Sequence, residues 1–128
     1  MIVLLDTSTP ICKLTLIDGT SRYHDEWQAD RLLAKNLLAY LRDQLAKHGK
    51  TFEHISSIGV MKGPGSFTGL RIGMTVLNTI ADANAIPIVG ESGDEWEATA
   101  LHRLHDGEND TIVLPLYGRD ANITVQRK

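Results

Sequence analysis

Residues 62–81 read KGPGSFTGLRIGMTVLNTIA and decide the fold, because a glycine-rich turn passes directly into a long apolar helix. A Walker A loop needs a lysine after its last glycine, whereas Lys62 precedes this loop. Pro64 takes the first glycine position of a G-x-S-x-G elbow, and the glycine spacing does not fit G-x-G-x-x-G. Ser66 is placed to cap the helix, and free amides there leave an anion contact open as an alternative.

The helix predicted over residues 66–84 is apolar around most of its circumference. At 100° per residue, two adjoining faces are apolar. They carry Phe67, Leu70, Met74, Leu77 and Ala81, and then Ile72, Val76, Ile80 and Ala83. Together they span roughly 200°, twice what a one-sided surface helix needs. Gly69 and Gly73 also let another backbone approach closely. Burial within this domain and a partner interface both satisfy this pattern.

The rest of the chain alternates between strands and helices. Residues 1–8, 12–19 and 20–28 read as three antiparallel strands, with an Asp-Gly hairpin turn between the last two. Helices are expected over residues 29–48, 66–84 and 91–107, and strands over residues 55–61, 85–91 and, once or twice, 110–128. The fold class is therefore α/β: a β-β-β-α-β-α-β-α mixed sheet with helices, plus a C-terminal β tail.

Composition and charge exclude several classes of protein. The 128 residues, with a net charge of −3, predict one ordinary globular domain and oppose a direct RNA-binding module, whose usual mark is a basic face. Cys12 is the only cysteine, which excludes an intrachain disulfide and a Cys-rich zinc site. The start lacks a signal-peptide pattern and no apolar run suits a bilayer, so a cytoplasmic protein without membrane contact is expected.

A polar turn follows the first strand at Asp6, Thr7 and Ser8. Ligands are often held at such a position, although the residues also suit an ordinary turn. Together with Ser66, these residues are the candidates for an anion or nucleotide contact.

No catalytic or metal-binding residue is predicted. His102 and His105, near Asp106, share a helix face, but a solvated surface is the expected role of a helix this polar. No Ser-His-Asp or Cys-His set is recognisable, and Cys12 falls in a strand core, where a thiol is usually inert.

Three stretches resemble the TsaB (YeaZ) family, the bacterial dimerisation subunits of the tRNA threonylcarbamoyladenosine machinery. They are MIVLLDTSTP at residues 1–10, the long and specific GPGSFTGLRIG at 63–73, and IPIVG at 86–90. VLPLYGRDANIT at 113–124 resembles the Pro-x-Tyr-x-Arg ending of that family. The resemblance implies a single actin-like, hexokinase-like (ASKHA, ribonuclease H-like) lobe over residues 1–90, with residues 91–128 packing on it as a short helix and strand tail.

The resemblance also implies a function. It makes the chain a non-catalytic scaffold that pairs with its paralogue TsaD, the threonylcarbamoyltransferase, and supports modification of the adenosine beside the tRNA anticodon. The TsaE ATPase joins the complex, contact with tRNA is indirect, and ATP and metal are expected on partner subunits rather than on this chain.

Pairing in the family uses the first two helices, here residues 29–48 and 66–84. The residues expected at the partner interface are Leu33, Leu37, Tyr40, Leu41, Phe67, Leu70, Arg71, Met74, Leu77 and Ala81. A charge buried at such a surface without a partner is costly, so Leu70→Glu or Met74→Glu is expected to abolish pairing.

One departure from the family keeps alternatives open. Relatives normally carry a second lobe, for which this chain has no room, and actin-like nucleotide sites lie between two lobes. A working minimal subunit is therefore expected. The alternatives are a half-sized actin-like nucleotide-binding enzyme or a glycoprotease-like homodimer. A homodimer and a heterodimer would cover the apolar surface equally well.

Overall fold

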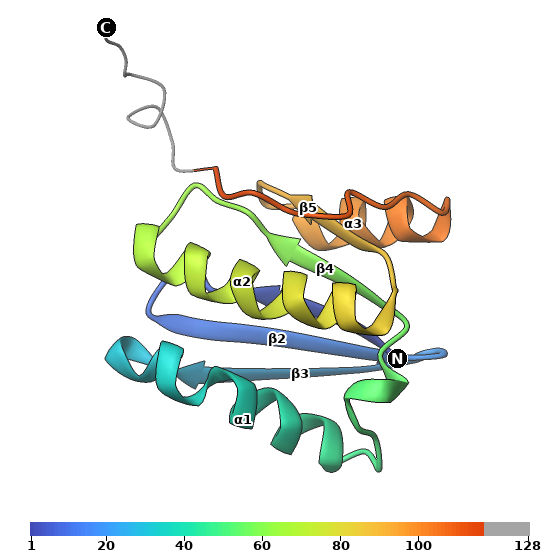
Figure 1. The fold of residues 1–128 in the computed structure, drawn as a ribbon, viewed down its shortest axis with the longest axis horizontal. Helices are drawn as coiled ribbons and strands as arrows, with labels where there is room; N and C mark the ends of the chain where they lie inside the picture. The colour runs from blue at the N-terminus through green and yellow to red at the C-terminus, as the bar shows by residue number, and fades with distance from the viewer. Residues whose placement is uncertain (117–128) are drawn as a thin grey trace, which may run out of the picture.

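A five-stranded mixed sheet forms the centre of the protein (Figure 1). The computed structural model describes residues 1–116. The strands lie in the order β3-β2-β1-β4-β5, with β1 to β3 antiparallel and β4 and β5 parallel to β1. Their bounds are Ile2–Asp6 (β1), Ile11–Asp18 (β2), Ser21–Gln28 (β3), Ser57–Met61 (β4) and Ile88–Glu91 (β5). The predicted meander followed by parallel crossovers is confirmed.

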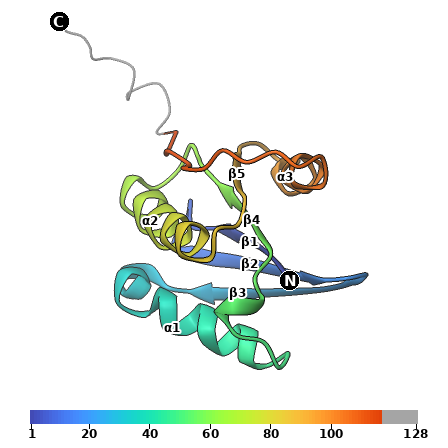
Figure 2. The same ribbon diagram turned by 45° about the vertical axis from the view of Figure 1, so that its right-hand side comes forward.

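Three helices cover the sheet, two on one face and one on the other (Figures 1 and 2). Helix α1 (Leu33–Ala46) and helix α2 (Phe67–Asn84) lie side by side on the first face, and α3 (Trp96–His105) packs on β4 and β5 from the second. The predicted order β-β-β-α-β-α-β-α is confirmed. Short 3-10 turns at Asp30–Leu32 and Phe52–His54 complete the connections.

Each face of the sheet has its own apolar core. Beneath α1 and α2, leucines at three- and four-residue steps along α1 meet the inward side chains of β1, β2 and β4. Beneath α3, Trp96 and Ala100 pack on Leu4 and Val89. In the part of the chain that the structure describes, no helix is long and apolar enough to cross a membrane.

The glycines of α2 admit the turn that follows β1. A Cβ atom on Gly69 would lie 2.4 Å from the carbonyl oxygen of Thr7, and one on Gly73 would lie 2.3 Å from the Thr7 hydroxyl. This hydroxyl donates a hydrogen bond of 2.7 Å to the carbonyl oxygen of Gly69. The close backbone approach expected from the glycine spacing is therefore present, and the neighbouring backbone belongs to this chain.

The predicted C-terminal β tail does not form a strand over residues 110–116. The free edge of β5 is instead bonded mainly by side chains: Ile88 N–H donates to Asn109 Oδ1, and Gly90 N–H donates to Asp110 Oδ2. Because these edge groups are already paired, no regular ladder continues there. Residues 117–128, the rest of the predicted tail, lie outside the described residues.

Residues 111–116, the strap, run beside α2. The side-chain amide of Asn78 donates to the carbonyl oxygen of Val113 and accepts from its N–H, each at 2.9 Å. Leu116 N–H donates to the carbonyl oxygen of Lys62. The strap is thereby fixed along the side of α2 that faces away from α1.

Arg103 on α3 ties α3, β5 and the segment before the strap, residues 108–110, together. Its guanidinium contacts the carboxylates of Glu91, Glu108 and Asp110, and hydrogen bonds to Asp110 and Glu108 raise its pKa. Burial acts to raise the pKa of Asp110, but hydrogen bonds from Arg103 and Gly90 N–H outweigh it, and the pKa falls below its usual value.

We predict that Gly69→Ala destabilises the protein by about 2 kcal/mol. The added Cβ meets a backbone carbonyl that cannot move aside, and the better helix propensity of alanine, about 1 kcal/mol, offsets only part of this cost. Urea denaturation measures the change. Thr75→Ala, at an exposed position of the same helix, serves as control and is expected to change stability by less than about 0.5 kcal/mol.

The lowered pKa of Asp110 predicts a pH dependence of stability. A carboxylate with a lowered folded-state pKa stabilises the protein above its unfolded value of 3.8, and this stabilisation is lost as pH falls through the folded pKa. Asp110→Asn is therefore expected to lower the free energy of unfolding by about 1 kcal/mol at pH 7. The difference in unfolding free energy between wild type and Asp110→Asn should become smaller towards pH 3.

Urea titrations at both pH values test this expectation. Asp106→Asn is the control, because Asp106 is half exposed and, among residues 1–116, forms an ion pair only with the exposed His102. If Asp110→Asn lowers the free energy of unfolding by the same amount at pH 7 and pH 3, the lowered pKa of Asp110 does not stabilise the fold.

Candidate partner-binding site

Seven of the ten side chains expected at the partner interface are buried in the chain's own core, none more than 5% exposed. They are Leu33, Leu37, Leu41, Leu70, Met74, Leu77 and Ala81. The sheet and the facing helix already cover them, which corrects the expectation that they contact a partner. Glutamate at Leu70 or Met74 would place a charge in this core and unfold the chain, so those variants do not report on pairing.

The other three expected residues lie at the surface. Tyr40 is half-buried against β3, where its hydroxyl donates to Asp25 and its ring stacks on Trp27 with 4.8 Å between centroids. Burial, followed by the hydrogen bond to Asp25, raises the pKa of Tyr40. Phe67 is 55% exposed at the start of α2, with the guanidinium of Arg71 5.1 Å from its ring centroid. Arg71 and Phe67 are thus available on the outer side of α2.

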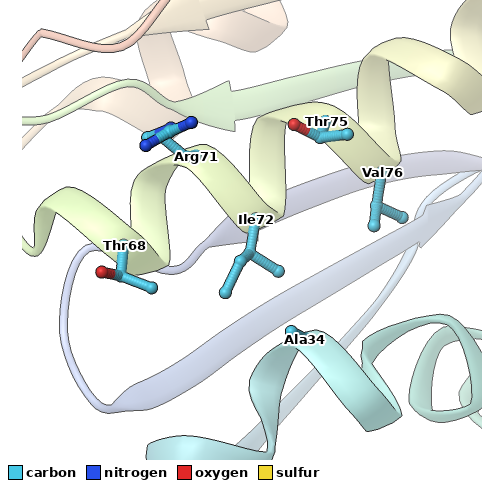
Figure 3. A pocket seen from close by; sticks show the side chains of 6 residues that line it. All are labelled: Ala34, Thr68, Arg71, Ile72, Thr75 and Val76. Carbon is cyan, nitrogen blue, oxygen red and sulfur yellow. The ribbon is translucent and has the colours of Figure 1, made fainter.

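A groove separates α1 from α2 (Figure 3). Its cavity of about 380 Å³ is lined by Ala34, Thr68, Arg71, Ile72, Thr75 and Val76. In Figure 3, Ile72 and Val76 point towards α1, whereas Arg71 and Thr75 lie on the opposite side of α2. Ile72 and Val76 could be recognised in the sequence, because they belong to the second apolar face predicted for this helix.

The groove continues towards the turn between β1 and β2. A hollow of about 570 Å³ shares Ala34, Thr68 and Ile72 with it, and reaches Pro10 and Arg31 in the 3-10 turn before α1. The two hollows form an apolar channel with a polar rim between α1 and α2. Such a channel is suited to receiving side chains from another helix.

The structure brings the four candidate anion-contact residues together. Ser66 N–H donates to the carbonyl oxygen of Ser8, and Ser66 Oγ accepts from Gly69 N–H at 3.1 Å, which confirms the predicted helix cap. Asp6 Oδ1 accepts from both the N–H and the hydroxyl of Ser8, while Thr7 is bonded to α2. The side chains of Asp6, Thr7 and Ser66 thus bond to other groups of the turn or of α2, as does the hydroxyl of Ser8, and an anion contact stays a prediction.

A threonine–histidine–glutamate chain escaped the sequence reasoning. On the second face of the sheet, Thr15 Oγ1 lies 3.0 Å from His24 Nδ1, and His24 Nε2 lies 3.0 Å from Glu26 Oε2. Register alone reveals it, because β2 and β3 pair Thr15 with His24. Thr15 is only 1% exposed and its hydroxyl also donates to Glu97, so it is not placed as a nucleophile.

Cys12 is an inert core thiol. Burial, together with the negative charges of Asp6 and Asp25, raises its pKa to about 12. Within residues 1–116, no group of three or more His, Cys, Asp or Glu side chains is arranged to hold a metal ion. His102 is exposed and pairs with Asp106 at 3.2 Å, as the solvated interpretation of this helix expects.

The family model described as "TsaD: tRNA N6-adenosine threonylcarbamoyltransferase" matches residues 27–127. The chain belongs to this family. Its curated relatives are proteins named "tRNA threonylcarbamoyladenosine biosynthesis protein TsaB". The Haemophilus influenzae protein is 31% identical over 108 residues, which are 84% of this chain and 46% of the relative. The Escherichia coli protein is 34% identical over 131 residues, covering 94% of this chain and 56% of the relative.

Solved structures agree with this assignment. "YeaZ from Pseudomonas aeruginosa" superposes with a TM-score of 0.69 at 30% identity, covering 82% of this chain and 49% of that one. A second structure from this organism is described as a protein "with similarity to peptidase YEAZ". It superposes with a TM-score of 0.67 at 33% identity, covering 71% of this chain and 42% of that one. The resemblance to TsaB (YeaZ) and the expected actin-like lobe are confirmed. The chain spans about half the length of the curated relatives it matches.

The raised pKa of Cys12 predicts slow thiol chemistry in the folded state. Only the thiolate is nucleophilic, so at pH 8 the native thiol should react with a disulfide reagent at least about a hundredfold more slowly than the unfolded chain. Absorbance of the released thiolate, with and without guanidinium chloride, measures both rates. Equal rates would show that Cys12 is open to solvent.

Proposed function

We propose that this chain is an accessory subunit that docks α1 and α2 onto TsaD and supports threonylcarbamoyladenosine formation on tRNA. The names of its TsaB relatives and its match to the TsaD family model support a role in this pathway. The pairing with TsaD rests on the family resemblance of the motif at residues 63–73 and on the surface that α2 presents.

The single observation that carries the proposal is the open groove between α1 and α2. Ile72 and Val76 are only partly buried there, although Leu70, Met74 and Leu77 in the same stretch of the helix are fully buried. The 18 residues of α2 extend over about 27 Å, enough to pack along the full length of a partner helix. A helix pair from TsaD laid on this face would remove both side chains from water.

The proposal assigns the chemistry to partner subunits. ATP and metal would be held by TsaD, TsaE would join the assembly, tRNA would be contacted indirectly, and the complex would work in the cytoplasm. The side chains of this chain support an accessory role. The Cys12 thiol is inert, and the hydroxyls of Thr7 and Thr15 are committed to hydrogen bonds in the fold. One structural neighbour is described as similar to a peptidase. None of the side chains of Cys12, Thr7 and Thr15 is an exposed nucleophile that would serve such an activity.

We predict that Ile72→Glu weakens binding to TsaD by at least about a hundredfold, because it places an unpaired charge in the centre of the contact. Size exclusion with light scattering, on the chain mixed with TsaD from the same organism, measures the complex. Circular dichroism checks that the variant is folded, as expected for a position that is only partly buried.

Lys47→Glu is the control, because Lys47 is exposed beyond the end of α1 and does not line the groove. Normal binding of TsaD by folded Ile72→Glu would show that this face is not the docking surface.

A further inference from the structure

Strand β3 leaves one edge of the sheet open. It stands at the end of the strand order, and within residues 1–116 no strand pairs with its outer side (Figure 1). Its eight residues, from Ser21 to Gln28, pair with β2 in a continuous register. In such an antiparallel ladder, alternate residues direct their N–H and C=O groups away from the neighbouring strand. The edge therefore presents a row of hydrogen-bonding groups about 27 Å long, which another extended backbone can satisfy.

A hollow of about 420 Å³ lies beside this edge, between β3 and the end of α1. Leu14 and Leu16 of β2 line it together with Tyr23 of β3. The ring of Tyr23 stacks on that of His48, with 3.9 Å between the ring centroids, and this contact fixes the residues after α1 beside the edge strand. Alternate side chains of a strand point to the same face of a sheet. Every second side chain of a strand added to β3 would therefore point towards the side of the hollow.

The lining of the hollow favours acidic side chains. Lys47 is exposed there and, in the part of the chain that the structure describes, forms no ion pair. Arg22 also lines the hollow, although Glu97 already pairs with its guanidinium. Asp25 is the one carboxylate among the described lining residues, and it accepts a hydrogen bond from the hydroxyl of Tyr40. The unpaired charge of the hollow is thus positive.

We propose that β3 and this hollow bind an extended segment of another protein that carries acidic side chains at alternate positions. The segment adds to the sheet as a further strand, with its backbone on the free edge and its carboxylates directed to Lys47 and to the ring N–H of His48. The backbone contacts give affinity for an extended chain, and the charges select an acidic one.

A second copy of this chain suits the edge less well. In an antiparallel pair of β3 strands related by a two-fold axis, a central residue lies opposite itself. Near the centre of β3 this residue is His24 or Asp25, so like groups would meet. On the side of the hollow, β3 carries Tyr23, Asp25 and Trp27. Because Asp25 is already bonded within its own chain, a second β3 offers no free carboxylate to Lys47.

NMR titration of the isotope-labelled protein with synthetic peptides tests the inference. The probe is acetyl-Thr-Glu-Val-Glu-Thr-Glu-amide, and the matched control peptide has lysine in place of each glutamate. Wild type should bind the probe at least about tenfold more tightly than the lysine peptide, with shift changes in β3 and at the end of α1. Lys47→Glu should remove this preference. Lys35→Glu, at an exposed position of α1 outside the hollow, carries the same charge change and should keep it.

N-methylation of alternate residues of the probe separates strand addition from simple charge attraction. Methyl groups on one set of alternate amides block the hydrogen bonds to β3, whereas methyl groups on the other set point away from the edge. One methylated peptide should therefore bind at least about tenfold more weakly than the probe, and the other should bind within about threefold of it.

The inference is overturned if the glutamate and lysine peptides bind equally, if the two methylated peptides behave alike, or if the shift changes lie away from β3. Self-association of wild type through β3 that excludes the probe would assign the edge to a second copy, and would overturn it as well. TsaD binding is an independent readout, because the hollow shares no lining residue with the channel between α1 and α2. Loss of the proposed function would therefore leave this inference standing, and the reverse also holds.

Discussion

The contact between Thr7 and the glycine face of α2 sets the position of every element around it. The Thr7 hydroxyl is buried and bonded to the carbonyl oxygen of Gly69. A side chain at Gly69 would collide with the Thr7 carbonyl oxygen, and one at Gly73 with the Thr7 hydroxyl. This contact brings the start of α2 down onto the end of β1. The height of α2 above the sheet then decides how deep the groove beside α1 is, and which side chains remain at the surface.

Much of the fold followed from periodicity. The alternation in β2, the leucine spacing in α1 and the wide apolar arc of α2 each predicted the element that formed. The C-terminal segment did not follow its pattern, because side-chain oxygens of Asn109 and Asp110 bond to the edge groups of β5. The periodicity of a sequence does not show that side-chain oxygens take the hydrogen bonds that the carbonyl oxygens of a neighbouring strand would otherwise accept.

The sequence placed the candidate site on α1 and α2, but most of the side chains it named fall on faces that are buried within this chain. The width of an apolar face predicts how much of a helix is buried. It does not tell whether the chain's own sheet or a partner buries it. Leu70, Met74 and Leu77 proved to face the sheet, whereas Ile72 and Val76 face the groove. Three-dimensional position decides between these faces, because α1 covers one flank of α2 and the strap the other. The Thr15–His24 contact was likewise hidden until strand register placed the two residues opposite each other.

The two tryptophans divide between the two faces of the sheet. Trp27 on β3 stacks on Tyr40 of α1, whereas Trp96 is 7% exposed in the apolar layer beneath α3. Each layer therefore contains one indole, in a different surrounding: one against a phenol ring, the other among aliphatic side chains. Replacing either by phenylalanine leaves a single tryptophan, whose selectively excited fluorescence reports on one layer, so the chain carries its own optical probes for whether the two faces unfold together.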